Sequence, residues 1–455
     1  MEQIKTHCLV IGAGAGGISA GIHFLDNFNG NIDSVENCIL LGEAVSNSAI
    51  SPWNIIENDK ELIREMILKA GENMSDYKVL NTFVEKYPHA IKFLERFNIP
   101  LQKSNLGKVP SIKGSEVLNI ITKEFEKNGG KRIIGHVKNF LTNNGEIKGV
   151  VISHNGIEKE IFANQIIIAG GGLTNLYKYS TGFSIARLPN ILALSLEAGL
   201  KIENLEFNMF HPFLITEDKM PKVLISGEIL QRGKYIDEDG NEFLSEEISN
   251  ALKNNHHHSV FPQMTREFYR QSLRSKIYMD LSKIDKDYFE NYKKTNEFGW
   301  VFKDKNLDEV QKFEIHPAFH FSIGGIKINE KAETNCKNIY AVGEISSGLH
   351  GCNRIGGFAI SEALIFGKIA GELASSKAKA PETGEFEKVG NSSVSNELKE
   401  KVWENLGPVK KRNDLEKFKE EIIGDSSDDK LVLAMINSSL NRESIGTHFI
   451  EENLI

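Results

Sequence analysis

The chain has 455 residues, of which 40% are hydrophobic and 25% are charged, a composition typical of a folded protein of two or three domains. Asp and Glu total 62 against 54 Lys and Arg, and the net charge of -8 argues against nucleic acid as the main partner, because phosphate binding needs a clustered basic surface. No apolar run approaches the roughly 18 residues that span a bilayer, and the N-terminus shows no signal-peptide pattern, so we expect a cytoplasmic protein with no membrane partner.

The N-terminal part of the chain predicts one strand–helix–strand unit. Residues 8–12 form a short apolar run that suits a buried parallel strand. Residues 13–25 have helical character, and residues 38–43 predict a second buried strand.

A GxGxxG motif joins the first strand to the helix. Gly12 makes the tight turn, Gly14 lets the backbone approach a pyrophosphate, and Gly17 lets the helix pack close to the strand. Glu43 ends the second strand, where its carboxylate can accept hydrogen bonds from ribose hydroxyls. The spacing predicts a dinucleotide site at the positive N-terminus of the helix.

The next part of the chain predicts helices and then antiparallel strands. Residues 60–97 carry helical periodicity with charged side chains on the outer face. Residues 131–162 alternate around Asn-Gly turns at 143–145 and 155–156, which predicts hairpins. Residues 165–172 predict a further buried strand that ends in glycines.

The second half of the chain changes character three times. Residues 204–319 are mixed and could form a separate domain, and residues 339–373 return to a strand–glycine–helix pattern. Residues 374–396 are rich in Ser, Ala, Gly and Lys and predict a linker or exposed loop. The tail at 397–455 is expected to be helical, with the charge run at 410–412 on a solvated helical face.

One Rossmann-type unit does not distinguish NAD from FAD. Residues 169–172 and 339–344 look like the second and third nucleotide contacts of flavoproteins, in which a substrate domain is inserted into the FAD domain. The long separation of Gly17 from Glu344 therefore favours a flavoprotein over a simple NAD dehydrogenase.

Several ordered motifs along nearly the whole chain then become specific. They are F-H-P at 210–212, L-I-S-G-E at 224–228, D-G-N-E-F at 239–243, T-R-E-F-Y-R at 265–270, I-Y-M-D-L at 277–281, H-P-A-F-H-F-S-I-G-G at 316–325, G-E at 343–344, H-G-C-N-R-I-G-G at 350–357 and R-E-S-I-G-T-H at 442–448. In these motifs the chain resembles the fumarate reductase/succinate dehydrogenase flavoprotein superfamily, and within it the L-aspartate oxidases.

The resemblance implies an α/β fold with three parts. A split Rossmann-type FAD-binding domain is expected at 1–204 and 322–375, and an inserted α+β capping domain, which carries substrate contacts, at 205–321. A linker and a short helical C-terminal region follow at 376–455.

The resemblance also implies FAD as the cofactor. Non-covalent binding is expected, because Ser46, Asn47 and Ser48 occupy the stretch where the respiratory members carry the histidine that links FAD. The residues implied to hold FAD are Gly12, Gly14, Ala15, Gly16, Gly17, Glu43, Ser46, Asn47, Ser48, Val137, Ala169, Gly170, Gly171, Asn190, Glu344, Arg354, Ala359 and Ile360.

The implied substrate site is built for a small dicarboxylate, whose charges need buried cationic and hydrogen-bonding partners. By analogy Arg354 would clamp one carboxylate in a bidentate manner, with His211 and His320 beside it. Ser226 and Glu228 would line the same pocket from the capping domain.

Arg266 occupies the position of the family's proton shuttle. An arginine is an unusual acid because its pKa exceeds about 12. The family solves this with a relay of neighbouring residues, for which Glu228 or Arg270 could serve here. Arg270 and Arg274 lie close by in the sequence and could be aligned with the shuttle instead.

The sequence departs from the family pattern at several places. The bulky Trp53 stands where the family has glycines and is expected near the flavin or substrate. Leu-Pro-Asn at 188–190 replaces an acidic element, and residues 101–115 lack the substrate loop of L-aspartate oxidases. Ile445 replaces an arginine of the C-terminal motif.

Four functional interpretations follow. The leading one is oxidation of L-aspartate or a related amino dicarboxylate to its imine, with oxygen or fumarate as electron acceptor. The second is a soluble fumarate or enoate reductase supplied by a small electron carrier, because the four cysteines form no CxxC pair and predict no metal or iron–sulfur site. A tailoring flavoenzyme for an unusual amino acid is the third. A non-catalytic flavin-binding homologue is disfavoured by the retained buried cations.

Overall fold

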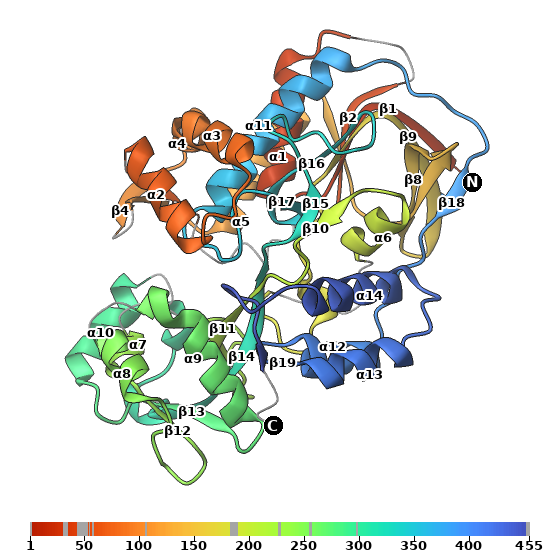
Figure 1. The fold of residues 1–455 in the computed structure, drawn as a ribbon. Helices are drawn as coiled ribbons and strands as arrows, with labels where there is room; N and C mark the ends of the chain where they lie inside the picture. The colour runs from red at the N-terminus through yellow and green to blue at the C-terminus, as the bar shows by residue number, and fades with distance from the viewer. Residues whose placement is uncertain are drawn as a thin grey trace.

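The computed structural model has the predicted α/β architecture. Figure 1 shows a large mixed sheet with helices beside it, a smaller antiparallel sheet with its own helices, and a C-terminal group of helices. The residues described are 2–30, 35–42, 53, 55–56, 59–104, 107–182, 190–225, 229–253, 257–296 and 299–451, without the side chains of 104 and 257–260.

The large sheet has the strand order β18-β7-β8-β9-β1-β2-β6, and β16 pairs with β9 beside this path. Its parallel part contains β1 (Glu2–Ile11), β2 (Glu36–Leu41), β6 (Gly130–Ile133), β9 (Ile157–Ile168) and β16 (Ile339–Ala341). Its antiparallel part adds β7 (His136–Asn143), β8 (Glu146–His154) and β18 (Glu387–Val389). The central parallel strands contain buried apolar runs at 8–11, 38–41, 166–168 and 339–341, as expected of strands covered on both faces, whereas the edge strand β6 is only partly buried.

The predicted hairpins are confirmed. The turn between β7 and β8 has positive φ values at Asn144 (48°) and Gly145 (78°), and the next turn has them at Asn155 (51°) and Gly156 (79°). Two positive φ angles in a two-residue loop match the right-handed twist of the strands, and Asn-Gly adopts them at little cost.

The strand expected at 165–172 is not separate from the second hairpin. It is the end of β9, which pairs antiparallel with β8 at its start and parallel with β16 at its end, while β1 runs along its whole length. β9 therefore joins the antiparallel part of the sheet to the parallel part.

Three helices pack together beside the large sheet: α1 (Ala15–Asn27), α5 (Gly114–Lys127) and α11 (Ala359–Lys377). Glycines allow α1 and α11 to approach each other closely. A Cβ on Gly367 would lie 2.6 Å from the carbonyl oxygen of Gly16, and a Cβ on Gly371 would lie 2.3 Å from that of Ala20. Larger residues at these positions would force the two helices apart.

Residues 60–97 form helices, as predicted. They are α2 (Lys60–Ala70), α3 (Tyr77–Lys86) and α4 (Pro88–Arg96). Asp59 caps α2 by accepting a hydrogen bond from the Leu62 amide, and Asp76 caps α3 in the same way. A small antiparallel sheet is made by β3 (Ile55–Ile56), β5 (Gly107–Pro110) and β4 (Leu101–Ser104).

The residues predicted as a capping domain contain the four-stranded antiparallel sheet and a separate cluster of buried apolar side chains. Its strands are β11 (Asn208–Ile215), β14 (Lys312–Ser322), β13 (Ile277–Asp280) and β12 (Lys234–Ile236). Its helices are α7 (Ile229–Arg232), α8 (Glu246–Lys253), α9 (His257–Ser272) and α10 (Lys286–Thr295), with short 3-10 turns η3 (Gly299–Phe302) and η4 (Leu307–Glu309). Of these helices, α9 packs on β11 and β14.

A short sheet lies between the large mixed sheet and the four-stranded sheet (Figure 1). Its strands are β10 (Ile202–Glu203), β15 (Gly325–Lys327) and β17 (Ser346–Ser347). The remaining short elements are η2 (Thr174–Leu176), α6 (Ile191–Glu197) and η5 (Gly343–Ile345).

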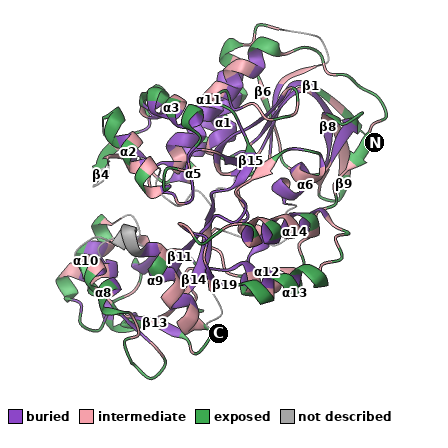
Figure 2. Ribbon diagram, viewed as in Figure 1, coloured by how far each residue is buried: buried purple, intermediate pink, exposed green. Residues whose placement is uncertain are grey.

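The predicted linker at 374–396 is partly wrong, because α11 continues to Lys377 and β18 pairs with β7. The tail then contains α12 (Asn396–Leu406), β19 (Lys410–Lys411), α13 (Arg412–Glu421), α14 (Ser427–Leu440) and β20 (Ile450–Glu451). The outer faces of its helices are exposed (Figure 2).

The expectation of a solvated helical face at 410–412 is wrong for its first residue. Lys410 lies in β19, which pairs in parallel with β20, and only 1% of Lys410 is exposed. Lys411 is exposed as predicted but lies in β19 and not in a helix, whereas Arg412 is exposed at the start of α13.

Among the described residues, no helix combines the length and the apolar character that crossing a bilayer would require.

Candidate functional site

The glycine-rich turn has the geometry that a pyrophosphate site needs. Gly12 has φ +111°, and its amide donates to the carbonyl of Leu41 at 2.8 Å, which holds the turn at the ends of β1 and β2. A Cβ on Gly17 would lie 1.8 Å from the Gly12 carbonyl oxygen. A Cβ on Gly14 would have no atom within 4 Å, so space is open directly before the N-terminus of α1.

These two glycines give a matched pair of variants. Gly17→Ala is expected to lower the melting temperature of the protein, because its methyl group would clash with backbone. Gly14→Ala is expected to melt like the wild-type apoprotein but to bind FAD at least about tenfold more weakly, since the methyl group enters the space left for the ligand. Thermal unfolding of the apoprotein and a flavin fluorescence titration measure the two effects. Wild-type FAD affinity in Gly14→Ala would contradict the assignment.

Three other segments meet at the same edge of the sheet. The amide of Ala169 donates to Ile11 at 2.7 Å, which continues β9 into the predicted glycine segment. Gly171 has φ +76° and open space around its missing side chain, whereas a Cβ on Gly172 would lie 2.0 Å from Oε1 of Glu344. A Cβ on Gly16 would lie 3.5 Å from the carbonyl oxygen of Ala363, so the first turns of α1 and α11 lie together.

The structure therefore brings most of the described cofactor candidates together at this edge. Gly12, Gly14, Ala15, Gly16, Gly17, Ala169, Gly170, Gly171, Glu344, Ala359 and Ile360 surround the carboxyl ends of β1, β9 and β16 or begin α1 and α11. This edge of a parallel sheet is where nucleotides bind. Open space beside the glycines and two helix N-termini fit the pyrophosphate of FAD.

Two predicted cofactor residues have evident structural partners. Val137 is buried in β7 opposite Ile152. The side-chain oxygen of Asn190 accepts a hydrogen bond from the Leu192 amide at 3.1 Å and so caps α6, while within the described residues its Nδ2 has no partner. Trp53, expected near the flavin or substrate, is 3% exposed in the main apolar core. The predicted site residues outside the described part are Glu43, Ser46, Asn47, Ser48, Ser226 and Glu228.

Arg354 carries a buried positive charge without a carboxylate bonded to it among the described residues. It is 7% exposed, its Nη1 donates to the Ile355 carbonyl at 3.1 Å, and its Nη2 lies 3.7 Å from Sδ of Met209. Within the same residues its Nε has no partner, and its Cζ lies 4.3 Å from the Phe321 ring centroid. Burial lowers the pKa of Arg354 to about 10, so the group stays charged at neutral pH. An unpaired buried cation of this kind can be stabilised by a bound anion.

Two carboxylates act on Arg354 from beyond ion-pair distance. Oε1 of Glu344 accepts a hydrogen bond from the Ser322 amide at 2.9 Å, and burial raises the pKa of Glu344 to about 7. Glu362 is bonded to Nε2 of His350 at 3.0 Å, and both of these residues are buried. Both carboxylates are therefore engaged elsewhere, and the guanidinium of Arg354 remains available.

Two histidines stand beside Arg354 on neighbouring strands. His211 lies on β11 and His320 on β14, with ring centroids 5.5 Å apart. Burial and the charge of Arg354 lower the pKa of His320 to about 3, so its imidazole is neutral. Nδ1 of His320 lies 2.8 Å from the hydroxyl of Thr181. A hydroxyl that donates to Nδ1 leaves the ring hydrogen on Nε2, which can then donate to an anion.

Arg266 is on the adjacent helix but is not in contact with this group. The Thr265 hydroxyl donates to the Phe210 carbonyl at 3.2 Å, which fixes α9 on β11 next to His211. The Cζ of Arg266 lies 4.6 Å from the ring centroid of Phe449, in the C-terminal segment. Arg266 has no hydrogen bond or ion pair within the described part of the chain. The structure thus brings together His211, His320 and Arg354 and leaves Arg266 beside them.

The structure distinguishes Arg266 from Arg270 by their contacts. Nη2 of Arg270 is bonded to Oε1 of Glu451 at 2.9 Å, and its side chain is 41% exposed. Burial, and then the charge of Arg270, lower the pKa of Arg266. Arg266, which forms no ion pair with a described residue, stays a candidate for proton transfer, and a relay through Arg270 stays a prediction.

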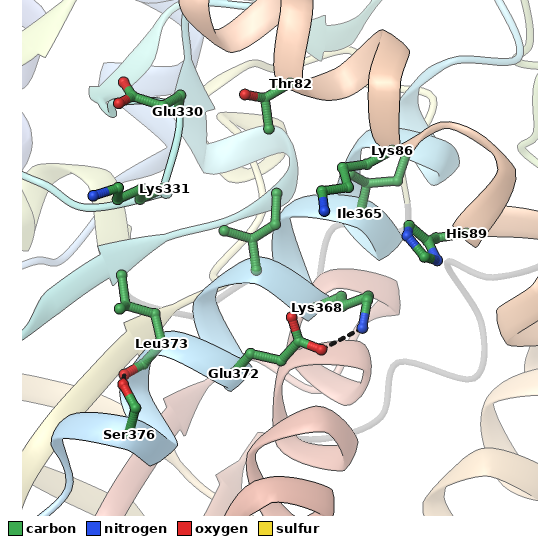
Figure 3. Close-up of a pocket in the computed structure, with 11 residues that line it drawn as sticks. Thr82, Lys86, His89, Glu330, Lys331, Ile365, Lys368, Glu372, Leu373 and Ser376 are labelled. Atoms are coloured by element: carbon green, nitrogen blue, oxygen red, sulfur yellow. Dashed lines mark hydrogen bonds and ion pairs between the residues drawn. The ribbon is translucent and has the colours of Figure 1, made fainter.

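A separate groove of about 490 Å³ lies between α3, α4 and the C-terminal half of α11 (Figure 3). Lys368 on its wall is ion-paired with Glu372. The groove contains none of the predicted site residues. It lies away from the N-terminal end of α11, where Ala359 and Ile360 begin the helix.

Two residues of the site region could not be found from the sequence. Thr181 lies in none of the motifs and meets His320 only because the chain between them folds back. Lys410 lies in a charge run, a pattern typical of an exposed surface, so the sequence predicted that its side chain would be exposed.

Comparisons with known proteins agree with this geometry. Residues 107–360, more than half of the chain, match the family model described as FAD binding domain. The L-aspartate oxidase of Saccharolobus solfataricus is 22% identical over 87% of this chain and 85% of the relative. A fumarate reductase (CoM/CoB) polypeptide of Methanothermobacter marburgensis is 21% identical over 91% of this chain and 84% of the relative. A solved quinol fumarate reductase of E. coli superposes with a TM-score of 0.78 at 18% identity, covering 100% of this chain and 92% of that chain.

Proposed function

Because this chain belongs to the FAD binding domain family, we propose that it oxidises L-aspartate or a closely related amino dicarboxylate to the imine. It is an FAD-dependent oxidoreductase of the L-aspartate oxidase and fumarate reductase family, and the proposal names the substrate. The observation that carries the proposal is the buried guanidinium of Arg354, which has no bonded carboxylate among the described residues and two histidines beside it.

The charge balance of this group supports a carboxylate substrate. Arg354 is charged and buried, and His320 is neutral and partly buried, so an arriving carboxylate would exchange its hydration for donors already in place. A guanidinium can bind both oxygens of one carboxylate, which also fixes the orientation of the molecule. His211 stands on the neighbouring strand, where it can contact the same ligand. The amino group is inferred from the L-aspartate oxidases among the relatives.

The reaction needs both a hydride acceptor and a proton acceptor. Bound FAD supplies the hydride acceptor. Arg354 and His320 hold the carboxylate, and the buried surroundings exclude water. Arg266, in its neutral guanidine form, takes up the proton that the amino group loses; its lowered pKa favours that form, and no described residue forms an ion pair with it. In this proposal residues 205–321 are a capping unit that carries Arg266 and His211.

The test is an anaerobic absorbance titration of the purified flavoprotein with L-aspartate, succinate and related acids in turn. Bleaching of the oxidised-flavin band by L-aspartate, but not by succinate, is the expected result. The Pyrococcus horikoshii L-aspartate oxidase, 26% identical over 87% of this chain, is a suitable positive control.

A different pattern would overturn the proposal. If no amino acid bleaches the flavin but chemically reduced protein is reoxidised by fumarate, the chain is a reductase. That outcome would agree with the similarity to a fumarate reductase over 91% of this chain. Failure of both half-reactions would leave a different substrate, shaped by Trp53 if that residue borders the site.

A further inference from the structure

Lys410 is a buried cation whose charge no described residue neutralises directly. It is 1% exposed, and its Nζ has no hydrogen-bond partner among the described residues. Its backbone amide donates to the carbonyl of Phe449 at 3.1 Å, which fixes β19 against the C-terminal segment. The ring of the same Phe449 lies under the guanidinium of Arg266.

The nearby carboxylate is already occupied. Glu206 is 1% exposed, with Oε1 accepting from Nε of Arg442 at 2.8 Å and Oε2 accepting from the Ser438 hydroxyl. Glu206 attracts Lys410 only from a distance. The carboxylate is thus shared, and the ammonium group keeps an unsatisfied charge.

The remaining titratable neighbours are Arg266 on α9 and His448 in the C-terminal segment. Burial and the charges of Lys410 and Arg442 lower the pKa of His448 to about 3, so His448 is neutral. Lys410 and Arg266 are therefore two cations that repel each other around Phe449. Burial lowers the pKa of Lys410 to about 8, with Glu206 opposing and Arg266 adding to the shift.

A contribution to folding stability does not explain why Lys410 is buried without a partner among the described residues. Replacing a buried, poorly paired charge by an apolar residue of similar volume is often neutral or stabilising. Methionine would fill nearly the same space as the lysine stem. A charge retained at this cost is more readily explained by its effect on Arg266.

We propose that Lys410 is a positioning residue for the proton-transferring arginine, and that its buried ammonium group makes Arg266 release its proton more readily. The inference rests on the proposed function, in which Arg266 takes up the substrate proton. Like charges repel each other, so below about pH 8, where Lys410 is charged, its ammonium group opposes the charged form of Arg266 on the other side of Phe449. A larger neutral fraction of Arg266 is then available as a base.

The experiment measures anaerobic flavin reduction by the amino dicarboxylate across pH for the wild type and three variants. Lys410→Met removes the charge, Lys410→Arg retains it, and Lys399→Met is a matched control. Lys399 lies on α12 of the same C-terminal region, is 9% exposed and has a pKa lowered by burial. Binding of a non-reacting dicarboxylate and thermal unfolding are measured on the same proteins.

In Lys410→Met the rate is expected to fall about tenfold below about pH 8, where Lys410 is charged in the wild type, and to approach the wild-type rate at higher pH, with dicarboxylate affinity unchanged. Lys410→Arg and Lys399→Met should keep the wild-type profile. Lys410→Met should also melt at a higher temperature than wild type below about pH 8. This gain should shrink toward pH 10.5, because the folded protein loses the lysine proton at lower pH than the unfolded chain.

A Lys410→Met protein with the wild-type pH profile overturns the inference. So does a Lys410→Arg protein that melts like the wild type but reacts like Lys410→Met. Wild-type protein whose flavin no amino dicarboxylate reduces contradicts the proposed function, and this inference with it. Reduction of the wild type at an unchanged rate in Lys410→Met contradicts the inference alone.

Discussion

An Arg354→Leu protein is expected to melt at a higher temperature than the wild type and to lose about 10²–10⁴-fold in kcat/KM for the dicarboxylate. Leucine removes a buried charge that has no bonded carboxylate in the described part of the chain, so the fold should gain stability. The substrate loses two charge-assisted hydrogen bonds, each worth about 1.5–3 kcal/mol, which gives the expected range.

Thermal unfolding and steady-state kinetics measure these opposite changes on one sample. Arg96→Leu is a suitable control, because Arg96 also lies beside an aromatic ring, that of Phe97, but is ion-paired with Asp26 on the surface. It should leave kcat/KM unchanged. Arg354→Lys should fall between the two, since an ammonium keeps the charge but loses the bidentate geometry. Near-normal kcat/KM in Arg354→Leu would remove the basis for a carboxylate at this position.

The second large effect is expected for Arg266→Leu. Turnover should fall about 10²–10⁴-fold, the usual contribution of general acid–base catalysis, whereas the affinity for a non-reacting dicarboxylate should hardly change. The reason is geometric, because Arg266 lies over Phe449 and the anion-binding group lies around Arg354. Stopped-flow flavin reduction gives the first quantity and a spectral titration gives the second.

Arg270→Leu is the matched control for this prediction. Arg270 is on the same helix one turn later, also lies near Phe449 and is held by Glu451 at 2.9 Å. Its loss should affect turnover only slightly. Equal losses in the two variants would mean that α9 contributes charge to the site but no specific proton acceptor.

The sequence predicted correctly those turns whose conformation depends on a few adjacent residues. The glycine turn that begins at Gly12 follows from a steric need that only glycine meets, and the hairpin turns follow from Asn144 and its following glycine. The proximity of His211 and His320 was implied by the family resemblance, and their rings lie 5.5 Å apart on neighbouring strands.

The remaining features depend on contacts between distant segments. Asn190 was expected at the cofactor, and in the structure its side-chain oxygen caps α6. Lys410 sits in a charge run that normally marks solvent, and only its pairing with β20 places it inside. The continuity of β9 was hidden because one strand changes from antiparallel to parallel neighbours along its length.

The close packing of α1 against α11 has a consequence for how the chain acquires its shape. The two helices are separated by more than 300 residues, and their glycine contacts form only when both are present. A chain emerging from the ribosome at about 5–20 residues per second would hold α1 for tens of seconds before α11 is made. During that time apolar surface of α1 is uncovered, and β9 lacks its partner β16. Contacts so distant in sequence slow folding, so protection from aggregation during synthesis should matter more for this protein than for one built from local contacts.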